Sequence, residues 1–407
     1  MSKKRPDTAR AKALEVPLAL AATGMEAELE LWIGGRRRRP EEVFGDPTAF
    51  IRGELMHRRG TSYHLPTGAA IYFDTGVIEV ATPAIEIERG AAARAGRLLW
   101  ESIRFIRREL DDWERHSGEQ ARLVGFSMHY NVSFELPPAA QGRQRTLRKL
   151  ALLLTYILPF PVMLLATNRR SSTGVGVRPR GNRLEVTVDF TPEPALSIAT
   201  GSLILGIVRA VMRWPSYDLS MLERMEIPVV AGFVPAKHAS RQGWVAHLSC
   251  FPANPFTCDV DEPTWPLRDG RRISLRELAG TIAHRFWPSI RRLAGPFSLR
   301  LIGGVIRGRA PSLLELPDRP PAYEDVGRLC TWDDLFPERL LSRSRYEQVL
   351  VRAVSGQRLR LGRHWYTPAN VRGWSQVVFR RDDGTTHVFP LDFLVRHLRD
   401  WQRQRRL

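Results

Sequence analysis

The sequence lacks the glycine-rich phosphate loops of the common nucleotide-binding folds. Neither a Gly-x-x-x-x-Gly-Lys-Ser/Thr sequence nor a Gly-x-Gly-x-x-Gly sequence after a strand occurs in its 407 residues, which argues against a P-loop or dinucleotide fold. Cysteine is also scarce. The chain has Cys250, Cys258 and Cys330 alone, at a spacing that fits no zinc site. We therefore expect reduced thiols in a cytoplasmic protein.

Long uninterrupted apolar runs are missing as well. The N-terminal stretch from Ala13 to Ala22 is broken by Glu15 and Pro17, which argues against an export signal. The run from Leu150 to Ala166 is almost wholly apolar, but it is short for a membrane span and contains two prolines. It predicts a buried helix followed by a turn, and no membrane partner is expected.

What the chain has in excess is positive charge. Its 61 Lys and Arg residues outnumber its 43 Asp and Glu residues, which gives a net charge of +18. Such a balance favours an anionic partner, such as an acidic protein, a phosphorylated nucleotide or a nucleic acid. The run from Arg36 to Arg39 and an expected basic helix from Leu391 to Arg406 keep a basic nucleic-acid-binding protein as the alternative function.

The order of the expected elements predicts an α+β protein with three parts. Residues 1–20 are expected to form a disordered basic N-terminus, residues 21–320 the main domain, and residues 321–407 a small C-terminal domain ending in a basic amphipathic helix. Apolar periodicity predicts strands at Ala21 to Ile33, Ala69 to Ile87 (one or two strands), Leu123 to Leu136 and Arg178 to Phe190, and helices at Ala91 to His116, Leu147 to Leu158, Ser197 to Trp214 and Ser274 to Ala294.

The first strand carries three glutamates at alternate positions. With a period of two, Glu26, Glu28 and Glu30 share one face. Like charges on one face repel each other, and a divalent cation would reverse this effect because hard cations prefer several carboxylate oxygens. A solvated edge face is an equally good interpretation of this motif alone.

A second acidic segment contains Tyr72, Asp74 and Glu79. Asp74 and Glu79 are an odd number of residues apart, so a straight strand would place them on opposite faces. Gly76 lies between them and could mark a bulge or bend that turns one of them round. The competing interpretation is a surface hairpin whose turn includes Asp74 and Gly76.

Two later strands add candidate ligands for a metal and a nucleotide. His129, Asn131 and Ser133 share one face of their strand, although a lone histidine is more often an ordinary core residue. Arg178 and Arg183 precede or open the strand that carries Glu185. Arginine forks onto phosphate oxygens, and the competing interpretation is a basic loop that forms a salt bridge with this strand.

Taken in order, these motifs resemble those of the glutamine synthetase-like carboxylate–amine ligases, and especially the Pup–protein ligase and Pup deamidase family. Residues Gly24 to Glu28 are similar to that family's Gly-x-Glu-x-Glu, and Gly68 to Pro83 to its Gly-Ala-Arg-x-Tyr-x-Asp-His-x-x-Pro-Glu-Tyr-x-Thr-Pro. Met128 to Asn131, Leu158 to Val162 and Arg183 to Val188 resemble further family motifs. The resemblance covers roughly residues 20–215, and the family's His-x-x-Pro before Glu79 is absent.

The resemblance implies a curved antiparallel sheet that forms a concave cradle backed by helices. It implies ATP and Mg²⁺ as cofactors, with a single catalytic base, Asp74. It also implies two groups of binding residues: metal ligands Glu26, Glu28, Glu79, His129 and Glu185, and nucleotide-site residues Arg183, Arg178, Asn131 and Tyr72.

The activity implied is the joining of a carboxylate to an amine. ATP would phosphorylate a glutamate-type carboxylate to give an acyl phosphate, and Asp74 would take a proton from the attacking amine. The partners implied are an acidic protein tag or a small carboxylate, together with an amine acceptor. The short spacing from Glu28 to Asp74 favours the ligase branch or a distinct amidoligase, and an inert scaffold of the same fold is a further alternative.

Overall fold

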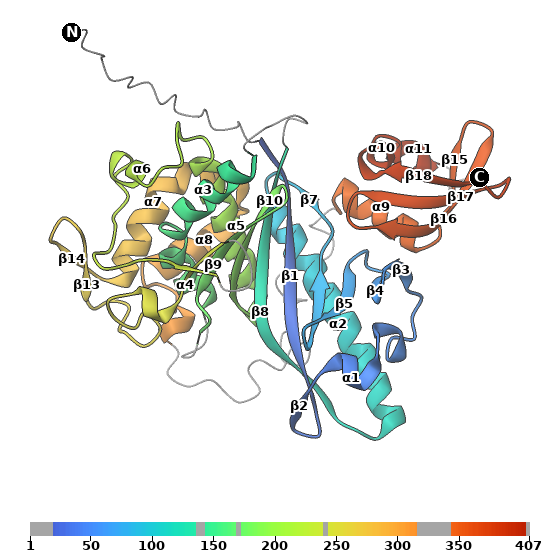
Figure 1. The fold of residues 1–407 in the computed structure, drawn as a ribbon, viewed down its shortest axis with the longest axis horizontal. Coiled ribbons are helices and arrows are strands. Elements are labelled where there is room, and N and C mark those ends of the chain that lie inside the picture. The colour runs from blue at the N-terminus through green and yellow to red at the C-terminus, as the bar shows by residue number, and fades with distance from the viewer. Residues whose placement is uncertain (1–18, 136–142, 168–171, 239–242, 316–342, 404–407) are drawn as a thin grey trace, which may run out of the picture.

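A computed structural model describes residues 19–135, 143–167, 172–238, 243–315 and 343–403. The expected N-terminal extension lies almost wholly outside these residues, and so does Cys330. The described chain forms a large unit built on one sheet and a small C-terminal unit with its own hydrophobic core, and Figure 1 shows the two units side by side. The expected α+β class is confirmed.

The large unit is organised around an antiparallel sheet. Its main path runs in the order β11-β12-β9-β10-β8-β1-β6-β5-β4-β3, with β2 and β7 paired to β1. Two 15-residue strands, β1 and β8, form its centre. The strands are β1 (Ala19–Ile33), β2 (Arg36–Arg38), β3 (Met56–Arg59), β4 (Ser62–His64), β5 (Ala70–Asp74), β6 (Val77–Ala81), β7 (Ile85–Glu86), β8 (Ala121–Glu135), β9 (Val175–Arg180), β10 (Arg183–Asp189), β11 (Ala236–Lys237) and β12 (Trp244–Ala246).

The central strands alternate strictly between apolar and polar residues. Met25, Ala27 and Leu29 of β1 are buried in the main core, whereas Glu26 and Glu28 face the other way. The same alternation holds in β8, where Met128 and Tyr130 point to the core. Side chains of successive strand residues point to opposite faces, so one face of the sheet is apolar and the other gathers the polar residues.

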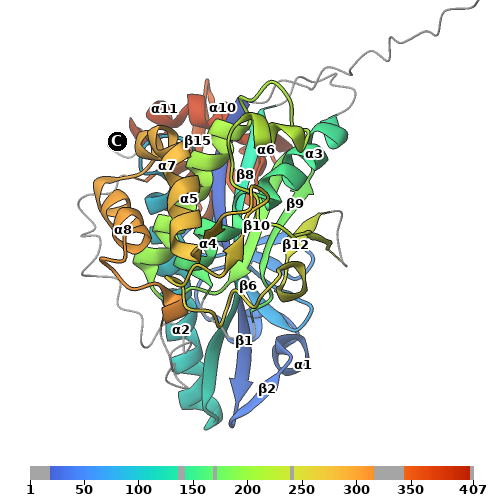
Figure 2. The same ribbon diagram turned by 90° about the vertical axis from the view of Figure 1, so that its left-hand side faces the viewer.

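Helices cover the apolar face, as Figure 2 shows for α4, α5 and α7 beside β8 and β10. Gly96 of α2 and Gly201 of α5 permit the close packing, because a Cβ at Gly96 would lie 2.4 Å from Ile198 and one at Gly201 would lie 2.7 Å from Met25. The remaining elements of this unit are α1 (Pro40–Phe44), α2 (Ala91–Ser117), α3 (Arg143–Thr155), α4 (Pro159–Ala166), α5 (Pro194–Val211), α6 (Ser220–Arg224), β13 (Trp265–Pro266), β14 (Arg272–Ile273), α7 (Leu275–Leu293) and α8 (Pro296–Ile306).

One helix, α5, is long and apolar enough to cross a membrane, but 83% of its apolar window is buried inside the protein. The run from Leu150 to Ala166 bends by 64° where α3 gives way to α4, as its prolines predict. Helix α7 begins with the expected capping box, in which Ser274 and Glu277 each cap the other's backbone amide. These apolar segments are therefore core elements of the large unit.

Two expectations about strands need correction. The segment from Arg178 to Phe190 is not one strand but the hairpin β9–β10, because Gly181 adopts a positive φ of 56° and turns the chain. The segment around Asp74 is likewise the hairpin β5–β6, with Thr75 at φ 53° and Gly76 at φ 90°. Two successive positive φ angles define a tight hairpin turn, so Gly76 marks a turn and not a bulge.

The small unit packs four strands against short helices. Its elements are α9 (Arg345–Val354), β15 (Leu359–Leu361), β16 (His364–Arg372), β17 (Gln376–Arg381), β18 (Thr386–Pro390), α10 (Leu391–Arg396) and α11 (Leu398–Arg403). The expected single helix from Leu391 to Arg406 is wrong, since it divides at His397 into α10 and α11. Its Leu394, Leu398 and Trp401 fill the second core.

A buried ion pair joins the two units. Arg97 of α2 lies 2.7 Å from Glu347 of α9, and both side chains are almost completely buried. Glu101 also pairs with Arg97, at 2.8 Å. Glu347 further accepts from the backbone of Ser344 in a second capping box. The small unit is therefore fixed to the sheet unit by satisfied charges as well as by apolar contacts.

Candidate active site

The polar face of the sheet brings residues from four strands together. Glu26 of β1 lies opposite His129 of β8, and Glu28 lies opposite both Ser127 of β8 and Glu79 of β6. Cross-strand partners in an antiparallel pair lie on the same face. The register therefore places all these side chains in one cluster at the centre of the sheet.

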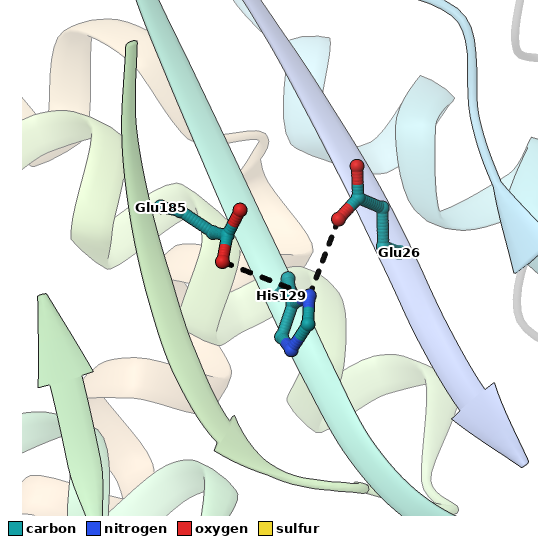
Figure 3. A group of neighbouring side chains, drawn as sticks. All are labelled: Glu26, His129 and Glu185. Atoms are coloured by element: carbon teal, nitrogen blue, oxygen red, sulfur yellow. Dashed lines mark hydrogen bonds and ion pairs between the residues drawn. The ribbon is translucent and has the colours of Figure 1, made fainter. Parts of the chain in front are cut away.

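His129 is the hub of this cluster. Its Nδ1 lies 3.2 Å from Glu26 Oε2 and 4.0 Å from Glu185 Oε1 (Figure 3), and its Nε2 lies 3.6 Å from Glu28 Oε1. Ser127 donates a hydrogen bond of 2.5 Å to Glu28 Oε2. Glu26, His129 and Glu185 place one ligand atom each within 4.8 Å of one another, which is a spacing that one cation can bridge.

The hairpin β5–β6 supplies a further carboxylate to the cluster. Tyr72 pairs with Glu79 in the register, and its hydroxyl donates a short hydrogen bond to Glu79 Oε1. Glu79 is 4% exposed. Because the chain turns back at Gly76, Asp74 lies on the same face as Tyr72 and Glu79. The odd spacing of Asp74 and Glu79 is thus resolved by the hairpin, and the opposite-face expectation for a straight strand does not apply.

Glu185 has a different environment from the other carboxylates. It is 1% exposed and is contacted by Arg178, by Arg180 Nε at 3.2 Å and by Arg183 Nη2 at 3.8 Å. The salt bridge considered for this segment is therefore present. Three guanidinium groups compensate the charge of one carboxylate, whereas Glu26, Glu28 and Glu79 share one histidine.

The pKa values reflect this excess of carboxylates. Burial, and then the charge of Glu26, raises the pKa of Glu79 to about 8. Burial alone would lower the pKa of His129, but the hydrogen bond to Glu26 and the charges of Glu28 and Glu185 raise it to about 9. Burial would raise the pKa of Glu26, yet contact with His129 holds it below its usual value. The metal-free cluster therefore retains protons that a cation would displace.

The remaining sequence candidates lie at the edges of the cluster. Asn131 is buried, and its Oδ1 has no hydrogen-bond partner within the described part of the chain. Asp74 ends β5 and accepts a hydrogen bond of 2.8 Å from Thr75. Glu30 does not join the cluster, because it pairs with Arg37 at 3.2 Å. Ser133 lines the same cavity as Asn131, and its hydroxyl donates to the backbone carbonyl of Ala22.

Sequence reasoning missed three residues beside the cluster. Arg58 of β3 has its guanidinium 6.0 Å from the Tyr72 ring and 4.8 Å from the ring of Trp374 in the small unit. His64 of β4 is completely buried and lies edge-on to Trp374 at 5.2 Å. Burial, and then the charge of Arg58, lowers the pKa of His64 to about 3. These residues come from very short strands and from a separate unit, so no local pattern linked them to the glutamates.

A cavity of about 340 Å³ opens above Glu26. Its walls come from β1, β8 and the β9–β10 turn, and the small unit closes it with Trp374 and Ser375. Among its lining residues are Asn131 and Arg183. Both units therefore contribute to one cavity that ends at the carboxylate cluster.

The donor set fits a hard divalent cation. Oxygen donors predominate, and Mg²⁺ prefers carboxylate oxygens and water, whereas softer metals would select thiolates. The described residues near the cluster include no cysteine, since Cys250 and Cys258 lie on other elements. A bound cation would also relieve the repulsion that raises the pKa of Glu79.

No protein-family model matches this chain, and no curated protein matches it. Among solved structures, it is similar to the complex between the prokaryotic ubiquitin-like protein Pup and its ligase PafA, at a TM-score of 0.48 and 11% sequence identity, with 93% of this chain and 92% of that chain covered. It is also similar to PafA in complex with ADP, at a TM-score of 0.41 and 12% identity, with 88% and 93% covered. Both are structures of the ligase family that the sequence motifs resemble.

Proposed function

We propose that this protein is an ATP- and Mg²⁺-dependent ligase that joins a carboxylate to an amine. The observation that carries the proposal is the convergence of Glu26, Glu28, Glu79 and His129 below an open cavity. Three carboxylates around one imidazole are unfavourable in a buried site unless a cation binds there. The order of the four sequence motifs supports the same activity.

In this proposal the carboxylate cluster holds Mg²⁺. Glu26, Glu28, Glu79 and His129 are the metal ligands, and Glu185 completes the set while its charge is shared with arginines. Bound Mg²⁺ would neutralise phosphate charge during transfer. Tyr72 orients Glu79 through its hydrogen bond, as outer-shell groups commonly orient metal ligands.

The nucleotide is assigned to the cavity above Glu26. Arg183 lines this cavity, and its side chain is partly exposed, whereas that of Arg178 is buried. Arg183 is therefore the main phosphate-binding residue in this proposal. Arg178 and Arg183 both contact Glu185, so Arg178 helps to hold that carboxylate, and with it Arg183, in place. Asn131 offers an unpartnered oxygen toward the same space. Arginine is suited to this role because its planar fork binds two phosphate oxygens at once.

The proposed reaction has two steps. The γ-phosphoryl group of ATP passes to a substrate carboxylate oxygen, which gives an acyl phosphate and ADP. The amine then attacks the acyl carbon, phosphate leaves, and Asp74 takes the proton that the amine loses. Asp74 is suited to this step by its position at the end of β5, on the face that carries Tyr72 and Glu79.

The substrate class is a glutamate-type carboxylate, either a small molecule or the end of an acidic protein tag, and the acceptor is an amine such as a protein lysine. The complex of PafA with Pup illustrates the second choice for a different protein. The net charge of +18 would speed encounter with an acidic partner through complementary fields. The scarcity of cysteine accords with a cytoplasmic location.

Calorimetric titration with Mg²⁺ and ATP tests the proposal. Glu28→Ala and Glu79→Ala should abolish Mg²⁺-dependent ATP binding while thermal unfolding stays cooperative. Glu30→Ala is the matched control, because Glu30 lies on the same strand but pairs with Arg37 outside the cluster. Nucleotide binding that survives both cluster variants would overturn the proposal. A wild-type protein that binds neither Mg²⁺ nor ATP would indicate an inert scaffold.

A further inference from the structure

A second cleft lies between the β3–β4 hairpin and the small unit. It has a volume of about 610 Å³ and is lined by three arginines, Arg58, Arg59 and Arg372, together with the imidazole of His57. The described residues that line it include no carboxylate. Asn370 of β16 donates toward His57 Nδ1 at 3.1 Å and so closes one side of the cleft. Such a lining attracts anions and excludes cations.

An irregularity in β3 directs Arg58 toward the inner end of this cleft. The pairing of β3 with β4 shifts register between His57 and Arg59, so Arg58 is an extra residue on its strand. Bulges of this kind redirect a side chain and occur frequently beside active sites. Arg58 Nη1 donates to Ser62 Oγ at 3.3 Å, which holds the guanidinium in place.

The guanidinium of Arg58 packs against aromatic rings and forms no ion pair with the carboxylates of the described residues, although the charges of Glu26 and Glu79 act on it from a distance. It stacks on Trp374 at 4.8 Å and approaches the Tyr72 ring at 6.0 Å. Its Nε is buried and has no hydrogen-bond partner among the described residues. A buried donor without a partner is costly, so this fork is prepared for an anion that arrives from the cleft.

We infer that this cleft admits the carboxylate-bearing substrate and that Arg58, supported by Trp374, holds its carboxylate at the edge of the cluster. This assignment rests on the proposed ligase function, because that reaction needs an anionic substrate next to Glu79. An incoming carboxylate is repelled by an acidic cluster, and a fixed guanidinium on its route offsets that repulsion. Arg58 is therefore a specificity-determining residue.

The two cavities divide the substrates between them. The nucleotide is assigned to the cavity that contains Arg183 and Asn131, and Trp374 forms part of its wall. The cationic cleft lies beside the neighbouring Gly373. The nucleotide in the first cavity and a second substrate in the cationic cleft can thus reach the carboxylate cluster from opposite sides of Trp374. This arrangement permits direct phosphoryl transfer between them.

Binding of a fluorescein-labelled hexaglutamate peptide, measured by fluorescence polarisation without Mg²⁺ or nucleotide, tests the inference. Wild-type protein should bind the peptide, and Arg58→Gln should weaken binding at least about tenfold, since charge-assisted pairs are strong. Arg58→Lys should recover only part of the loss because lysine lacks the planar fork. Arg36→Gln, an exposed change on β2, should stay within about twofold of wild type.

Several outcomes would overturn the inference. One is no peptide binding by wild-type protein, and another is equal binding by Arg58→Gln. A third is a single-stranded oligonucleotide that displaces the peptide and binds Arg58→Gln as tightly as wild type. That result would indicate that the positive surface binds nucleic acid. If Arg58→Gln fails to fold, the substitution Arg372→Gln at an exposed residue of the same cleft should still weaken peptide binding about threefold or more. Peptide binding that depends on Arg58 in a protein without Mg²⁺–ATP binding would support the cleft and defeat the ligase proposal.

Discussion

His129 and His64 are both buried on the polar side of one sheet, yet their pKa values shift in opposite directions. The pKa of His129 rises to about 9 among Glu26, Glu28 and Glu185, whereas that of His64 falls to about 3 because it is buried beside Arg58. Burial lowers the pKa in both cases. The charged neighbours account for the difference. Glu26, Glu28 and Glu185 surround His129 and form what we call the acidic half, whereas Arg58 lies beside His64 in what we call the cationic half.

The largest effect is expected at Glu185, which lies at the border of the acidic half. Glu185→Gln should lower the free energy of unfolding of the metal-free protein by about 3 kcal/mol, because it leaves buried Arg178 without its partner. Chemical denaturation measures this loss. The double variant Glu185→Gln with Arg178→Met should regain part of it, and a Glu185→Gln protein as stable as wild type would contradict the border assignment.

Glu79 should behave in the opposite way. Glu79→Gln replaces a buried carboxyl group that is largely protonated at pH 7 with a neutral amide, so the metal-free protein should be about as stable as wild type. Its Mg²⁺ affinity should nevertheless fall roughly a hundredfold, since ligand charge sets affinity for hard cations. Calorimetry and denaturation on the same sample check both parts. Unchanged Mg²⁺ affinity would remove Glu79 from the ligand set.

The acidic half should also bind Mg²⁺ more tightly as pH rises. With its pKa raised to about 8, Glu79 is protonated in the metal-free protein at pH 7 and must lose that proton to a cation. His129, with its pKa raised to about 9, must also lose a proton to act as a ligand. Affinity should then increase by up to about a hundredfold per pH unit below pH 8, by about tenfold per unit between pH 8 and pH 9, and level off above pH 9. Titration in two buffers of different ionisation enthalpy counts the protons released. An affinity independent of pH would refute this coupling.

The smallest effect is expected at His64, in the cationic half. Because its folded pKa lies below its unfolded value, the unfolded state binds more protons between pH 6.5 and 3, and stability is lost as pH falls. Wild type should lose about 1.4 kcal/mol more than His64→Gln between pH 7.5 and pH 5.5. Denaturation curves at the two pH values test this. Equal losses in both proteins would mean that His64 is protonated when folded.

Much of the sheet could be predicted from the chain because alternation in β1, β8 and β10 is regular. Alternation placed Glu26 and Glu28 on one face of their strand, whereas the family resemblance named them and His129 as candidate ligands. The register then brings the three side chains together. The turn at Gly76 was left open between a bulge and a hairpin, because a straight strand and a tight hairpin share the same local pattern. Arg58 and Trp374 could not be identified, since their proximity depends on a bulge in a four-residue strand and on packing between residues more than 300 positions apart.

The ion pair between Arg97 and Glu347 has a practical consequence for truncation. A shortened chain that stops before α9 would remove the buried partner Glu347 and leave Arg97 with Glu101 alone. It would also remove Trp374 from its place above the sheet. Deletion of the small unit should consequently cost several kcal/mol of folding free energy. Loss of activity in such a fragment would therefore combine damage around α2 with the loss of Trp374 from the first cavity and from its contact with Arg58, so point variants of Trp374 are the better test of the small unit's role.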